Sequence, residues 1–146
     1  METPPDFPQD LYYDPRHHMW VRPVPGTQRV VVGMDPMGLD SIGELVYLTL
    51  PEAGEKVAQG GGMGTLEAEK MTGPLTSPVS GKITARNPQA LKTPRLINED
   101  PFLAGWMVEL EPDDWAGESA RMVSGKAVAG WVADETERMR ERGWLK

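Results

Sequence analysis

Short apolar runs, separated by turn-forming residues, occupy most of the chain. His18 to Pro23 and Arg29 to Met34 have the length and composition of strands, and Pro25-Gly26-Thr27 between them predicts a hairpin. The 16 glycines and 14 prolines are spread along the sequence at a density that a helical bundle would not tolerate. The pattern therefore predicts a mainly β protein with tight turns.

The central part of the chain continues this strand pattern. Glu44 to Leu50 is largely apolar on both of its faces, which predicts a buried strand. Met63 to Glu69 and Leu75 to Pro78 predict the two arms of a hairpin, with Lys70 where the chain reverses. Further strands are expected at Lys56-Val57, Lys82 to Arg86 and Trp106 to Leu110.

Helical signals are confined to short segments and to the C-terminal part. Asp35 is a favourable N-cap, Pro36 suits the first helical position, and Gly43 predicts the end of this short helix. Asp113-Asp114 predicts another helix start. From about Ser124 or Gly125 to Arg142 the period changes to that of an amphipathic helix. Val128, Trp131, Val132, Glu135 and Met139 follow the helical period, and the charged residues, Glu135 among them, are expected to be mostly solvated.

Charge and composition exclude several classes of function. Fifteen Lys and Arg against 22 Asp and Glu give a net charge of −7, which argues against nucleic acid or an anionic membrane as a partner. The chain has no cysteine, so disulfides, Cys-ligated metals and a Cys nucleophile are excluded. No apolar run is long enough to span a membrane, and Met1 to Asp6 lacks the features of a secretory signal. We therefore expect a cytoplasmic protein.

Residues suited to catalysis are scarce. His17 and His18 are the only imidazole groups, and no serine lies in a nucleophile-elbow context. We expect one histidine at the surface and the other packed beside Trp20, with no metal site. An independent enzyme that uses His18 remains one hypothesis.

Lys70 at the expected hairpin tip suggests a different chemistry. A lysine there is usually only a solvated charge, yet a carrier protein needs one amine projected from its body on a rigid turn. A long acyl-lysine can then visit several active sites without dissociation, which raises effective concentration rather than affinity. Glu67 and Glu69 would mark this lysine electrostatically for a ligase.

A series of motifs gives this interpretation a family context. From about Asp14 to Asp113 the chain resembles the H protein of the glycine cleavage system and its lipoyl-carrying relatives. The motifs that carry the resemblance follow in order: His18-Met19-Trp20-Val21, Val32-Gly33-Met34-Asp35, Gly43 to Gly54, Glu67-Ala68-Glu69-Lys70, Ser77 to Gly81, and Asn98 to Trp106.

The resemblance implies a barrel-sandwich hybrid, a flattened β-barrel with short helices and a C-terminal helix. It divides the chain into an extended arm (1–15), a lipoyl-carrier domain (16–112) and a helical segment packed on it (113–146). It also implies lipoate joined as an amide to Lys70, in a carrier that catalyses nothing alone. Glu67 and Gly54 match positions read by lipoylating enzymes, and His18, Ser80 and Asp100 match a cleft that shelters the loaded arm.

The sequence also departs from typical members of the family. The run of Lys70, Gly73 and Pro74, together with Phe7 to Tyr13, resembles H-like proteins of the heterodisulfide-reductase-like sulfur-oxidation system, and this is the branch that we expect. The alternative is the glycine cleavage H protein itself. A biotinyl carrier is more distant, because Glu69 precedes Lys70 and the Trp20 motif is foreign to biotin domains; an unmodified binding module is the remaining alternative.

Each branch implies its own partners. Both need a lipoate ligase or transferase and dihydrolipoamide dehydrogenase. The sulfur branch adds a heterodisulfide-reductase-like complex. The glycine cleavage branch adds glycine decarboxylase and aminomethyltransferase.

Overall fold

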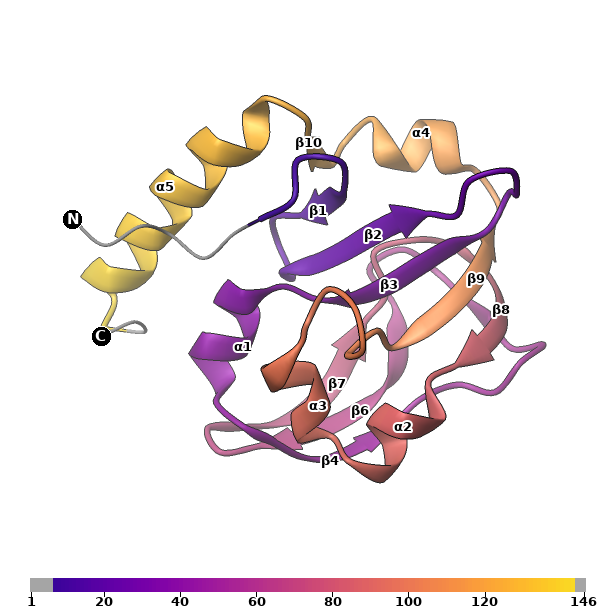
Figure 1. Cartoon of the computed structure of the whole chain (residues 1–146), viewed down its shortest axis with the longest axis horizontal. Helices are drawn as coiled ribbons and strands as arrows, with labels where there is room; N and C mark the ends of the chain where they lie inside the picture. The colour runs from indigo at the N-terminus through magenta and orange to yellow at the C-terminus, as the bar shows by residue number, and fades with distance from the viewer. Residues whose placement is uncertain (1–6, 144–146) are drawn as a thin grey trace.

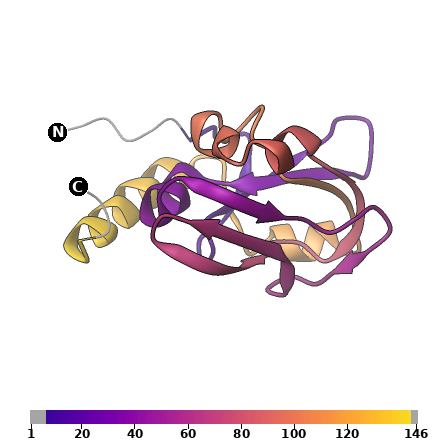
Figure 2. The ribbon, with the colours of Figure 1, turned by 90° about the horizontal axis from the view of Figure 1, so that it is seen from below.

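The computed structural model describes residues 7–143, in which two antiparallel sheets face each other across an apolar core (Figure 1). The larger sheet has the strand order β10-β1-β2-β3-β9-β8-β5, and the smaller has the order β4-β6-β7, nearest the viewer in Figure 2. The strands are β1 (Tyr12–Asp14), β2 (Met19–Pro23), β3 (Val30–Met34), β4 (Leu45–Thr49), β5 (Lys56–Val57), β6 (Gly62–Ala68), β7 (Met71–Thr76), β8 (Gly81–Arg86), β9 (Val108–Pro112) and β10 (Val123–Ser124). The helices are α1 (Pro36–Ile42), α2 (Pro88–Lys92), α3 (Arg95–Glu99), α4 (Trp115–Ser119) and α5 (Ala127–Glu141).

The predicted first hairpin is confirmed as β2 and β3. Trp20 pairs with Gly33 across the two strands, and the Trp20 indole lies against the glycine backbone. A Cβ atom at residue 33 would lie 2.5 Å from that ring, so only glycine fits there. The Trp20 Nε1–H donates to the carbonyl of Pro101 at 2.9 Å, which satisfies the polar atom of the buried ring.

The predicted helix starts and the Lys70 hairpin are also confirmed. Asp35 caps α1 by accepting a hydrogen bond from Gly38 N at 3.0 Å, and Asp114 caps α4 in the same way through Gly117 N. Strands β6 and β7 pair from Gly62 and Thr76 down to Ala68 and Met71. The second arm begins at Met71, four residues earlier than the sequence predicted.

The expectation that the strand at residues 44–50 is buried on both faces is wrong. Val46 and Tyr47 of β4 are 55% and 60% exposed. A register irregularity between Leu45 and Tyr47 turns two consecutive side chains toward solvent. The apolar pattern did not reveal this, because only the inward face of this sheet is covered.

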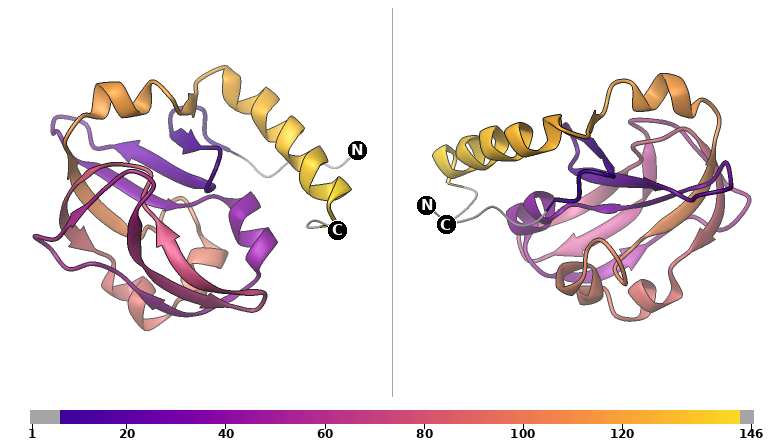
Figure 3. Two further views of the ribbon diagram at one scale, coloured as in Figure 1. Left: turned by 180° about the vertical axis from the view of Figure 1, so that it is seen from behind. Right: turned by 45° about the horizontal axis from the view of Figure 1, so that its top comes forward.

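Two apolar clusters build the interior. The first lies between the sheets and includes Met19 and Val21 from the larger sheet and Leu48 and Leu66 from the smaller one. Each such side chain contributes about 1.5–3 kcal/mol when it is fully buried. The second cluster joins the larger sheet to α5 and to the segment that leads into β1. Figure 3 shows α5 and this segment at the same end of the molecule.

The second cluster packs residues 7–15 together with the C-terminal helix α5. The described part of the expected arm, residues 7–15, includes β1 and buries Phe7, Leu11 and Tyr13 against α5. It is therefore packed against the body. Strand β10, which the sequence analysis did not predict, pairs with β1 just before α5. Residues 1–6 of the arm and residues 144–146 at the end of the chain lie outside the described residues.

The observed architecture confirms the predicted mainly β class with short helices and a C-terminal helix. Among residues 7–143, no helix is long and apolar enough to cross a membrane.

Candidate functional site

Lys70 lies on the two-residue turn between β6 and β7, and its side chain is exposed, as the sequence predicted. The backbone of this turn is held against the end of α1. The Lys70 N–H donates to the carbonyl of Ile42 at 2.9 Å, and the Glu69 N–H donates to the carbonyl of Glu44 at 3.1 Å. The Glu69 carboxylate in turn accepts a hydrogen bond from Glu44 N at 2.7 Å. A free amine is thus carried by a fixed stretch of backbone.

Asn98 of α3 supports the corner on which this turn rests. Its side-chain oxygen accepts from Leu45 N at 2.9 Å, and its amide nitrogen donates to the Gly43 carbonyl at 3.1 Å. These bonds satisfy backbone groups where α1 ends and β4 begins. The sequence analysis saw Asn98 as part of a motif, and the structure gives it this supporting role.

Carboxylates surround the exposed amine. Glu67 and Glu69 precede it on the hairpin and are exposed. Asp40 on α1 lies close enough to respond to the lysine: partial burial raises the pKa of the Asp40 carboxyl, and the Lys70 ammonium partly offsets that rise. The amine therefore lies in an acidic neighbourhood.

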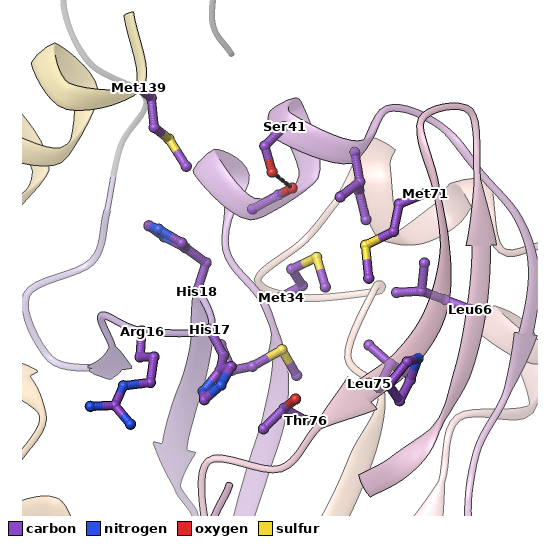
Figure 4. A pocket seen from close by; sticks show the side chains of 14 residues that line it. Arg16, His17, His18, Met34, Ser41, Leu66, Met71, Leu75, Thr76 and Met139 are labelled. Carbon is purple, nitrogen blue, oxygen red and sulfur yellow. Dashed lines mark hydrogen bonds between the residues drawn. The ribbon is translucent and has the colours of Figure 1, made fainter. Parts of the chain in front are cut away.

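A pocket of about 240 Å³ opens beside the turn (Figure 4). Its walls are mostly apolar, and its polar residues come from the turn before β2, from α1 and from β7. The apolar lining residues are Met19, Met34, Ile42, Leu66, Met71, Pro74, Leu75 and Met139, and the others are Arg16, His17, His18, Gly38, Ser41 and Thr76. Met71, next to Lys70, connects the tip to the pocket.

His18 joins this pocket to the C-terminal helix. Its Nδ1 lies 3.2 Å from the Asp35 carboxylate and its Nε2 lies 3.3 Å from the Glu135 carboxylate on α5. The imidazole also stacks on Trp131, with ring centroids 5.8 Å apart. The predicted packing of a histidine beside Trp20 is therefore wrong, and the ring partner is Trp131 of α5.

The two carboxylates set the protonation of this histidine. Burial alone would lower the pKa of His18, but the hydrogen bonds and charges of Asp35 and Glu135 outweigh it and raise the pKa above its ordinary value. Burial raises the pKa of Asp35 as well, and the contact with His18 offsets part of that rise. When protonated, the imidazole pairs with Asp35 at the start of α1 and with Glu135 on α5, and it thereby links α5 to the end of the barrel near α1.

The structure places the other predicted site residues apart from one another. Ser80 is held by Glu118, whose carboxylate accepts from both Ser80 N and Ser80 Oγ at 2.7 Å. The Asp100 carboxylate accepts a hydrogen bond from Ala104 N at 3.1 Å, within its own loop. Neither residue lines the pocket beside Lys70, so of the three predicted cleft residues only His18 does.

Glu67 and Gly54 also lie at different places. Glu67 pairs with Tyr47 and Thr72 in the second row of the small sheet from the tip. Gly54 has a φ of 97° in the turn after β4. Because Leu45 pairs with Ala68 near the tip, β4 leads away from Lys70 and Gly54 follows its distant end.

Sequence reasoning missed the contribution of α5 to the site. Met139 lines the pocket, and Glu135 and Trp131 hold His18. All three follow the predicted helical period, but Glu135 was expected to be mostly solvated, and the periodicity does not say which surface the apolar side of the helix covers. Within the described part of the chain, no cluster of three or more His, Asp or Glu side chains could hold a metal ion.

Comparison with known proteins identifies the family to which the chain belongs. The family model described as glycine cleavage H-protein matches residues 11–135. The chain belongs to the glycine cleavage H-protein family. Members of this family carry a lipoate attached covalently to a lysine, and they are carriers rather than catalytic enzymes.

Similar proteins include glycine cleavage system H proteins of several bacteria. The protein of Magnetococcus marinus is 35% identical over 125 residues, covering 86% of each chain. That of Myxococcus xanthus is 41% identical over 109 residues, covering 75% of this chain and 82% of its own. A crystal structure of an H protein from Mycobacterium marinum matches with a TM-score of 0.75 at 28% identity, covering 89% of this chain and 99% of the other. These relatives favour the glycine cleavage alternative over the sulfur-oxidation branch that we expected.

Proposed function

We propose that Lys70 is the lysine that carries lipoate, and that this H-protein family member transfers an aminomethyl group from glycine decarboxylase to aminomethyltransferase. The observation that carries the proposal is the exposed Lys70 amine on a turn fixed to Ile42 and Glu44. A carrier needs this combination, because the amine must be free for acylation while its base stays in one place.

The pocket beside the turn suits the attached group. The lipoyl group consists of an alkyl chain ending in a dithiolane, and it supplies the sulfur that accepts the transferred group. Leu66, Met71 and Leu75 offer apolar contacts for such a chain and exclude water from it. His18 and Ser41 provide polar groups in the same pocket.

Of the predicted recognition residues, Glu67 fits the proposal best. It lies on the exposed face of β6, three residues before the lysine, where an enzyme approaching the amine would meet it. Gly54, at the distant end of β4, would require a lipoylating enzyme that extends along the whole sheet. We retain Lys70, Glu67 and His18 as the functional residues.

The first experiment identifies the modification. The chain is produced with a lipoate ligase and lipoic acid, and its intact mass is measured with the site located by fragmentation. A gain of one lipoyl group on Lys70, lost in Lys70→Arg and kept in Lys82→Arg, is expected; Lys82 is a matched exposed lysine on β8. A biotin mass, or no modification at residue 70, would contradict the proposal.

The second experiment identifies the transferred group. Lipoylated protein is incubated with glycine decarboxylase and labelled glycine, and then with aminomethyltransferase and tetrahydrofolate. Label on the wild-type protein but not on Lys70→Arg, followed by its transfer, is the expected result. Absence of label on fully lipoylated protein would contradict glycine as the source.

One feature of the pocket favours a second candidate, the carrying of sulfur intermediates. Arg16, His17 and His18 line the pocket, and no Asp or Glu is among its lining residues. The Arg16 guanidinium in this lining would attract an anionic group rather than an aminomethyl cation, whereas His17 and His18 are already paired with Asp14, Asp35 and Glu135. Loading by a heterodisulfide-reductase-like complex with a sulfur substrate, with no loading from glycine, would select this candidate.

A further inference from the structure

The outward face of the small sheet leads directly to Lys70. Tyr47 pairs with Glu67, which pairs with Thr72, so these three residues form one row across β4, β6 and β7. The next pair toward the tip is Ala68 and Met71, and Lys70 lies in the turn beyond them. An enzyme that reaches the Lys70 amine from this side therefore meets Tyr47.

Val46 and Tyr47 are unusual for an exposed position. Successive side chains of a strand normally alternate between the two faces, but the irregularity between Leu45 and Tyr47 leaves both exposed, at 55% and 60%. Bulges of this kind are enriched next to functional sites, where they redirect side chains. Among residues 7–143 no helix or strand covers either residue, although each has considerable apolar area.

The charge around this pair is acidic. Glu67 lies beside Tyr47, and Glu44 and Glu69 are exposed on the adjacent corner. The chain as a whole has a net charge of −7. An aromatic anchor bordered by carboxylates is complementary to an apolar pocket bordered by lysine or arginine side chains.

We propose that Val46, Tyr47 and Glu67 form the docking surface for the enzyme that acylates Lys70. This inference depends on the proposed function, because it takes Lys70 as the acylated residue. In the reaction, the neutral Lys70 amine attacks the carbonyl carbon of an activated lipoyl or octanoyl donor, an acyl-adenylate or thioester. The amide forms, the activating group leaves with the bonding electron pair, and the amine loses one proton.

The surface is assigned to this enzyme because it is continuous with the amine. The acyl donor must be brought within bonding distance of Lys70, so the acylating enzyme must cover the end of the hairpin. Tyr47 lies one strand away, in the second row from that end. A large aromatic side chain at the centre of such a contact typically contributes tenfold or more to affinity.

The test measures the rate of acylation of purified, unmodified protein by a lipoate ligase with lipoate and ATP. We expect Tyr47→Ser to lower kcat/KM roughly tenfold, mainly through KM, and Val46→Ser to lower it by a smaller factor. Tyr47→Phe should restore most of the rate. Leu103→Ser is the matched control, because Leu103 is 67% exposed on the loop after α3, outside this sheet, and its rate should equal that of wild type.

The outcomes separate the two proposals. If wild-type protein is not acylated at Lys70, the proposed function fails. If wild type is acylated and Tyr47→Ser is acylated equally fast, the docking surface is overturned while Lys70 remains the site. Denaturation midpoints of all variants exclude loss of folding as the cause. A dimer at assay concentration that Tyr47→Ser dissociates would assign the patch to a second copy of the chain and also overturn the proposal.

Discussion

The two sheets of this protein differ in what covers their outward faces. On the larger sheet, residues 7–15 and α5 form a second apolar cluster in which Tyr13 and Trp20 have no exposed surface. On the smaller sheet, Tyr47 and Glu67 face solvent. The covered sheet provides the stability of the body, and the open sheet leaves its side chains available to other proteins. The division allows the exposed Lys70 to project without contributing to the core.

The largest expected contrast comes from removing an aromatic ring from each face. Trp20→Ala should lower the free energy of unfolding by about 3–5 kcal/mol, because the buried ring loses its packing on Gly33 and its hydrogen bond to Pro101. Tyr47→Ala should change it by about 0.5 kcal/mol or less. Urea denaturation of the two variants measures both values. Equal losses would mean that the small sheet is covered as well.

The buried cap of α1 should have the next largest effect. Asp35→Ala removes the hydrogen bond to Gly38 N and the partner of His18, and should cost about 1–3 kcal/mol. Asp40→Ala on the same helix is the control, since its side chain makes neither contact. The same denaturation measurement applies, and a loss at Asp40 that matches the loss at Asp35 would refute the assigned role of the cap.

The link between His18 and α5 should make stability depend on pH. A raised pKa in the folded state means that folding stabilises the protonated imidazole; this contribution is complete below pH 6.5, the ordinary pKa, and is lost as pH rises through the folded value. The pKa of Asp35 is also raised in the folded state, so its contribution to stability likewise decreases as the pH rises, starting from a lower pH than that of His18. The free energy of unfolding, followed from pH 6 to 9, should fall in wild type.

The control for this pH dependence is the neighbouring histidine. His18→Gln should flatten the decline above pH 6.5, whereas His17→Gln should leave it, because the ion pair that His17 forms within residues 7–143 is with Asp14 of β1 and does not reach α5. A decline of the same size in His18→Gln would show that other groups cause it.

The smallest expected effects are at the hairpin tip. Lys70→Arg should leave the free energy of unfolding within about 0.5 kcal/mol of wild type, because the side chain is exposed. The Lys70 backbone amide should nevertheless exchange slowly with solvent deuterium, because it donates to the Ile42 carbonyl. Hydrogen exchange followed by NMR measures this, and exchange at the rate of an unprotected amide would contradict the fixed turn.

Local chemistry explains what the sequence predicted correctly. The Asp35 cap with Pro36, and the turn at Lys70, are encoded by residues that lie next to one another, and the structure has both. The motif from Asn98 to Trp106 likewise pointed to the family before its hydrogen bonds to the β4 corner were known. Periodicity also identified the buried side of α5, including Val128 and Met139.

The errors concern contacts between distant parts of the chain. Glu44 to Leu50 is largely apolar on both faces, and so is the buried part of β2. Other parts of the chain cover both faces of β2 but only one face of β4, and the residues of the two strands do not indicate this difference. The ring against His18 is Trp131, more than a hundred residues away, rather than the nearby Trp20. Ser80 was expected at the cleft by position, but Glu118 of α4 holds it elsewhere.

The hydrogen bond from Lys70 to Ile42 has a consequence for how partner enzymes are served. Because the peptide at the turn is tied down, the sweep of any attached group begins at the lysine Cα and is limited to rotation about single bonds beyond it. Two enzymes whose active centres lie farther apart than twice that radius must take turns at the same corner of the protein. The order in which they bind would then be decided by competition for one binding surface rather than by bending of the hairpin.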